Sequence, residues 1–259
     1  NLSNSGNITG VSWLSIGRGN GAGAVSSDLT LNNTSSVTAT NMSGGFNAGN
    51  VATAPKGVVT LNGSSAITAN TTVNIAESAN SNITINLNGT STFTQNTTGS
   101  GQTRLGMADG AVGTINVSGG TATFERDLIL GSGGTGTGKV IINSGTVNAA
   151  TTVERWLILN PATGAGHGEI EVNGGNLNLN TNTDIRMSQN AGSTGANIVT
   201  LSSGAITGFS GNKTGLGAGS VVDLGWAGTA AANNTFNLNG GTLTIGQVIT
   251  NSNTPAATF

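Results

Sequence analysis

Cysteine and tyrosine are absent from the 259 residues, proline occurs three times, and charged side chains make up only 7% of the chain. A scaffold held together by disulfides is excluded without cysteine. The low proline content excludes a collagen and a proline-rich linker. The absence of cysteine is compatible with an exported bacterial protein.

The charge is small and scattered. Eight Lys and Arg stand against ten Asp and Glu, a net charge of −2. Because no basic run exists, we expect no nucleic-acid partner. No stretch approaches ~18 consecutive apolar residues, so we expect no membrane insertion. No cationic start leads into an apolar core, and we expect a mature form or a segment of a longer protein.

The chain does contain 43 glycines and a short motif that recurs eight times. The motif is apolar-x-apolar followed by Asn or Ser, and its second apolar residues are Leu31, Leu61, Leu87, Val117, Ile142, Val172, Leu201 and Leu238. The steps between them are 30, 26, 30, 25, 30, 29 and 37 residues. A period near thirty indicates a repeat protein.

Two further alternating segments accompany each motif. The second segments begin at Val37, Ile67, Phe93, Ala122, Val147, Leu177, Ile206 and Leu243. The third begin at Leu14, Phe46, Val73, Leu105, Leu128, Leu157, Ile185 and Val222. Strict alternation is the period of a half-buried strand, and no stretch keeps a helical period.

Strands this short bury a face only when equivalent coils stack, each strand pairing in parallel with its counterparts ~4.8 Å above and below. The sequence therefore predicts an all-β, single-stranded parallel β-solenoid with about eight coils and three short strands per coil. We expect residues 1–259 to form one domain, a rod roughly 38 Å long.

Two segments carry a family resemblance. Gly-Thr-Ile-Asn-Val-Ser-Gly-Gly-Thr at 113–121 and Phe-Asn-Leu-Asn-Gly-Gly-Thr-Leu-Thr-Ile at 236–245 resemble the autotransporter-type β-strand repeats of large bacterial surface and secreted proteins. The resemblance implies a right-handed parallel β-helix, an extracellular or cell-surface location and an adhesion-type role. It implies no catalytic residue.

Cofactor and metal sites are not expected. The glycine-rich segment from Gly17 to Gly23 precedes no predicted helix, whose N-terminus a phosphate loop requires. His167 is the only histidine, and we interpret it as a solvated loop residue beside Glu169 and Glu171.

Charged residues gather near the third segments of repeats four to seven. In a stacked solenoid equal offsets superpose, which predicts one charged corner containing Trp156. Its candidate ligand-binding residues are Trp156, Arg126, Arg155, Arg186 and Arg104. If the chain is an enzyme, a glycoside hydrolase or polysaccharide lyase, its candidate catalytic carboxylates are Glu125, Asp127, Glu154 and Asp184. The same residues also fit a salt-bridge ladder without catalytic function.

The second segments carry a different pattern, since their outward positions are mostly Thr and Asn. These outward positions form two rows along the rod. The second row contains Thr38, Thr68, Thr94, Thr123, Asn148, Asn178, Thr207 and Thr244. Regular Thr-x-Thr rows resemble ice-binding β-solenoids, and Thr also favours exposed strand positions. Asn and Ser after each first segment predict a ladder that satisfies turn backbone groups.

These patterns favour a secreted or surface-displayed stalk or adhesin-like module that binds polysaccharide or cell-surface glycan through the Trp156 corner. The alternatives are a polysaccharide-degrading β-helix enzyme and an ice-binding face. Because no capping helix or edge charges mark the two ends, we also expect a longer parent protein or end-to-end self-association.

Overall fold

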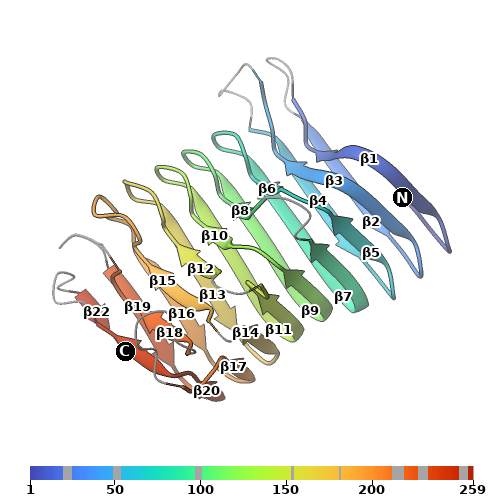
Figure 1. Ribbon diagram of the computed structural model, residues 1–259. Helices are drawn as coiled ribbons and strands as arrows, with labels where there is room; N and C mark the ends of the chain where they lie inside the picture. Colours follow the sequence, from blue (N-terminus) through green and yellow to red (C-terminus); the bar gives the residue numbers. More distant parts are fainter. Residues whose placement is uncertain are drawn as a thin grey trace.

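The structure is a computed structural model that describes residues 1–19, 25–48, 54–96, 101–152, 155–180, 182–211, 219–226, 233–250 and 256–258. It confirms a parallel β-solenoid of about seven turns, close to the eight predicted, and its described residues contain no helix. The coils stack from the N-terminal to the C-terminal end of the rod (Figure 1).

The strands form three faces, and within each face neighbouring strands pair in parallel. The first face contains β2 (Ser26–Leu31), β4 (Lys56–Leu61), the first halves of β7 (Asn82–Gln95), β9 (Val112–Phe124) and β11 (Thr137–Ala149), then β13 (His167–Val172), β16 (Asn197–Leu201), β19 (Asn233–Leu238) and β22 (Ala256–Thr258). The second contains the first halves of β1 (Asn7–Ile16) and β3 (Ser36–Gly44), β5 (Ala66–Ala69), the second halves of β7, β9 and β11, then β14 (Asn176–Leu179), β17 (Ala205–Thr207) and β20 (Thr242–Thr244). The third contains the second halves of β1 and β3, β6 (Val73–Ile75), β8 (Thr103–Leu105), β10 (Leu128–Leu130), β12 (Trp156–Leu159), β15 (Asp184–Met187), β18 (Val221–Asp223) and β21 (Gln247–Ile249).

Not every coil has three separate strands. In β7, β9 and β11 the first and second segments form one bent strand, and in β1 and β3 the second and third segments do so. The bend in β7 lies at Gly89, whose φ of 67° only glycine adopts readily.

The predicted column of eight residues is in register along the whole first face. Seven members are fully buried, whereas Leu238 is 47% exposed. Its strand β19 pairs with β22 only over Asn233–Thr235, so in the described structure Leu238 packs against Leu201 on one side only. The seven buried members belong to one hydrophobic core from Ile16 to Phe236.

Two strands of the third face begin earlier in the sequence than predicted. The segment from Phe46 was expected on this third face, but Met42–Gly44 pairs with β6 instead. The segment from Leu105 to Met107 was expected in the next coil, but Thr103–Leu105 is the strand. A left-handed residue directly after the strand explains both errors, because it turns Phe46 and Met107 off the sheet.

We predict that Val117→Asp unfolds the rod, because it places an unpaired charge between Leu87 and Ile142 in the buried column. The loss in unfolding free energy should be roughly 3 kcal/mol or more, measured by chemical denaturation with circular dichroism. Thr114→Asp is the matched control, since Thr114 lies on the outer side of the same strand beside Lys139. Equal stability of the two variants would contradict the observed register.

Candidate functional site

The predicted corner lies on the third face, and its equal offsets are largely confirmed. Trp156 pairs with Asp184, and Asp127 takes the same place one coil earlier because Leu128 pairs with Leu157. Arg104 was expected in this row and is not in it. It pairs with Asn74 and Ile129, which places it in the row of Arg186, because its strand begins two residues earlier than predicted.

Hydrogen bonds nevertheless connect Arg104 to this row. Arg104 Nη2 donates to Gln102 Oε1 at 2.8 Å, and Gln102 Nε2 donates to Asp127 Oδ2 at 2.8 Å. The backbone N–H of Trp156 donates to Asp127 Oδ1 at 3.0 Å. Both oxygens of Asp127, which is only 4% exposed, are therefore occupied as acceptors. The carboxylate thus links the Gln102 side chain to the backbone of Trp156.

Arg186 is the centre of the corner. Its guanidinium carbon lies 4.3 Å from the ring centroid of Trp156 and 3.8 Å from that of Trp226, and its Nη2 donates to Asp184 Oδ2 at 3.0 Å. Arg186 is buried, and its Nε has no hydrogen-bond partner among the described residues. A guanidinium between two indole faces is a cation–π arrangement that is strengthened by burial.

Sequence reasoning missed Trp226. It lies in the turn after β18 and shares no offset with Trp156, so a search for equal offsets could not find it. Its backbone N–H donates to Met187 O at 3.2 Å, which holds the turn against β15. Trp226 is half-exposed at 46%, and its ring lies against the Arg186 guanidinium group.

The remaining corner residues do not form the predicted ladder within the described part of the chain. Glu125, Arg126 and Arg155 make no ion pair there, and the Nε atoms of both arginines are buried without a partner. The backbone N–H of Arg126 donates to Gln95 Oε1 at 3.2 Å. Glu154 lies outside the described residues. Catalytic and ligand-binding roles for the corner residues stay predictions.

We predict that Arg186→Met lowers the unfolding free energy by about 3–5 kcal/mol, because it leaves the Asp184 carboxylate buried without its cation. Chemical denaturation measures the change. Arg104→Met is the control, since Arg104 lies exposed in the same row and should cost less than about 1 kcal/mol. Equal losses would show that the buried pair contributes nothing special.

Asp223, the neighbour of Arg186 in the adjacent strand, has a raised pKa. Burial is the largest cause, the Asp184 charge adds to it, and the Gly225 N–H and the Arg186 charge only partly offset it. The folded state therefore binds a proton above the ordinary pKa of 3.8, where the unfolded state has lost it. This group costs stability progressively as the pH rises from 3.8 through the raised value.

We predict that Asp223→Asn is neutral or stabilising at pH 7 and flattens the fall in stability with rising pH. Asparagine keeps an acceptor for the Gly225 N–H and removes the ionisation that burial disfavours. Thermal melts of both proteins between pH 3 and pH 8 measure the difference. A variant that loses stability at pH 7 but not at pH 3 would contradict this account.

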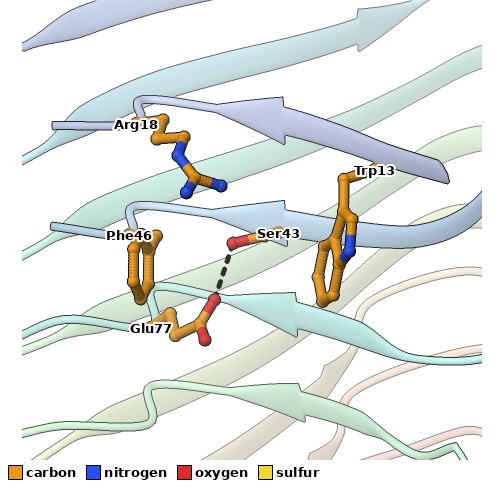
Figure 2. Close-up of a pocket in the computed structure, with 5 residues that line it drawn as sticks. All are labelled: Trp13, Arg18, Ser43, Phe46 and Glu77. Atoms are coloured by element: carbon orange, nitrogen blue, oxygen red, sulfur yellow. Dashed lines mark hydrogen bonds between the residues drawn. The ribbon is translucent and has the colours of Figure 1, made fainter. Parts of the chain in front are cut away.

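A second site lies on the same face near the N-terminal end of the rod. A cleft of about 340 Å³ is lined by five residues, which are Trp13, Arg18, Ser43, Phe46 and Glu77 (Figure 2). The volume lies in the range of small-ligand sites, ~300–1,000 Å³. Trp13 is 46% exposed and shares the row of Trp156, as its offset predicts, through Asn41 of β3.

One corner of the backbone positions the other wall of this cleft. Residues directly after the third strand are left-handed in successive coils, at Gly17, Gly45, Ala76, Gly106, Gly131, Asn160 and Ser188. The residues that follow the first three are Arg18, Phe46 and Glu77, which therefore form a vertical row. At Gly45 a Cβ atom would lie 2.8 Å from Cβ of Ser81, so glycine is required there twice over.

Polar contacts hold the cleft in shape. Ser43 Oγ donates to Glu77 Oε2 at 2.6 Å, a short charge-assisted hydrogen bond (Figure 2). Arg18 Cζ lies 5.0 Å from the ring centroid of Phe46. The Gly19 N–H donates to Phe46 O at 2.8 Å, which ties the two coils together. An aromatic wall, a carboxylate and a guanidinium thus meet around one open space.

His167 is a half-buried strand residue rather than the loop residue expected. It begins β13, its Nδ1 contacts Ala196 O, and its Nε2 lies 3.4 Å from Glu169 Oε2. Lys139 pairs with the same carboxylate. Burial raises the pKa of Glu169, but the hydrogen bond and charge of Lys139, together with hydrogen bonds involving Glu171 and His167, outweigh it and the pKa is lowered.

The polar rows of the second face are in register over all eight repeats. Ice binding by this face stays a prediction. An Asn ladder is present at the first turn: Asn62 Nδ2 donates to Asn32 Oδ1 at 2.9 Å, and Asn88 Nδ2 donates to Asn62 Oδ1 at 3.0 Å. These bonds join side chains to one another rather than to the turn backbone groups predicted.

Among the described residues no cluster of three or more His, Asp or Glu is placed to bind a metal ion, and no helix could span a membrane. Comparison with protein-family models, with curated proteins and with solved structures found no match to this chain.

Proposed function

We propose that this chain is a secreted or surface-displayed β-solenoid that binds carbohydrate, and that the cleft at Trp13 is its binding site. The observation that supports this most directly is the combination of an exposed indole face with hydrogen-bonding groups around one open space. Sugar rings present an apolar C–H face and a rim of hydroxyl groups, so they need a flat aromatic surface beside donors and acceptors.

The cleft supplies each of these groups. Trp13 offers the flat surface, Glu77 accepts hydrogen bonds from hydroxyl groups, and Arg18 donates. Ser43 already occupies one Glu77 oxygen and so fixes the direction of the other. A site that is held rigid before binding loses less conformational entropy when a sugar enters.

The Trp156 corner fits this function less well. Arg186 is stacked on Trp156, whereas the cleft leaves Trp13 beside open space. Two of the four carboxylates expected in an enzyme, Asp127 and Asp184, are buried acceptors there, so binding rather than cleavage is proposed. A rod that displays one site on its side suits a stalk or adhesin-like module, and end-to-end association stays a prediction.

We predict that Trp13→Ala weakens glycan binding at least tenfold, about 1.4 kcal/mol, because it removes the stacking surface. A glycan array followed by isothermal titration measures the change, and a thermal melt should show little loss, since Trp13 is 46% exposed.

Trp156→Ala is the comparison variant, because Trp156 lies in the same row but outside the cleft. It should keep glycan affinity and lose stability through its contact with Arg186. If Trp156→Ala loses binding and Trp13→Ala keeps it, the binding site is the corner. If the parent protein binds no glycan, the proposed function is wrong.

A further inference from the structure

We infer that the cleft selects acidic sugars, and that Arg18 binds the carboxylate of a uronic-acid residue while Trp13 stacks on a ring. This inference rests on the proposed carbohydrate binding and adds the class of ligand.

Arg18 carries a charge that no ion pair in the described part of the chain neutralises. In the described part of the chain, the ion pairs involve Lys139, His167 and Arg186, and Arg18 joins none of them. Arg18 is exposed, and in Figure 2 its guanidinium group points into the space between Phe46 and Trp13. Arg104, Arg126 and Arg155 join no ion pair there either, but Arg18 is the arginine among them that lines the cleft.

The Arg18 guanidinium group contacts Phe46, whose ring centroid lies 5.0 Å from Arg18 Cζ. This cation–π contact favours a guanidinium group held beside the cleft. A planar fork of donors matches the two oxygens of a carboxylate, which accept two parallel hydrogen bonds.

The charges of Arg18 and Glu77 are well separated along the rod. Arg18 and Glu77 occupy equivalent positions two coils apart, about 9.6 Å along the rod, with Phe46 between them. The Glu77 carboxylate is held by the Ser43 hydroxyl group rather than by Arg18. Glu77 therefore accepts hydroxyl hydrogen bonds from one sugar while Arg18, at the other end of the cleft, is available to an anionic group.

The test uses polygalacturonate, alginate and hyaluronan, each compared with its carboxyl-reduced form, which keeps the linkage and loses the charge. We expect at least one acidic polymer to bind ten times more tightly than its reduced form by isothermal titration. Arg18→Gln should weaken binding of that acidic form about tenfold and leave the reduced form unchanged. Added NaCl should weaken binding of the acidic polymer far more for the parent protein than for Arg18→Gln.

Lys56→Gln is the matched control, because it removes one exposed cation outside the cleft and should change neither affinity. If acidic and reduced forms bind equally, and Trp13→Ala abolishes both, carbohydrate binding stands and the selection of acidic sugars is wrong. If the reduced forms and the neutral glycans of the array bind and the acidic forms do not, the selection is also wrong. If nothing binds, the proposed function fails and this inference fails with it. Equal losses for Arg18→Gln and Lys56→Gln would show that general charge attraction, not the cleft, accounts for the preference.

Discussion

The stacking of equivalent residues at ~4.8 Å in parallel strands is the constraint on which the rest of this structure depends. Every position in one coil lies directly above and below its counterparts, so each choice of side chain is repeated as a row. Inward rows form a single core from Ile16 to Phe236. Outward asparagines bond along the rod, as Asn116 does to Asn86 at 2.9 Å. The same geometry brings like charges together wherever a charged residue recurs, which gives a physical reason for a charged content of only 7%.

At Arg186 and Asp223 other interactions compensate the charge to different extents. Arg186 is tolerated in a buried outward position because Asp184 neutralises it and two tryptophans cover it. Asp223 is less completely compensated, and its raised pKa reflects this. Arg18 differs from both, since only an aromatic ring supports it. The two tryptophans of one row, Trp13 and Trp156, thus face different surroundings, one beside open space and one against a cation.

Most of the fold could be predicted from the sequence because the signal is repeated. The anchors at Leu31 and its seven counterparts fixed the pairing of the first face, and the segments after them fixed the second. The third face was harder, because its strands are only three or four residues long in most coils and a left-handed residue ends them. Phe46 looked like an inward strand residue from its alternation alone, and only the backbone turn at Gly45 places it outside. Alternation gives the period of a strand but not the residue at which it stops.

The candidate cleft could not be predicted from the repeat pattern either. Arg18, Phe46 and Glu77 are unlike in chemistry and lie 28 and 31 residues apart, so no search for similar residues connects them. They meet because the corner before each is left-handed in three successive coils, at Gly17, Gly45 and Ala76. A repeat fold makes its structure from residues that are alike at equal offsets. A binding site needs a donor, an acceptor and an apolar surface together, and it must therefore be built from residues that differ at equal offsets. In this rod the corner row of the first three coils meets that condition beside an open cleft.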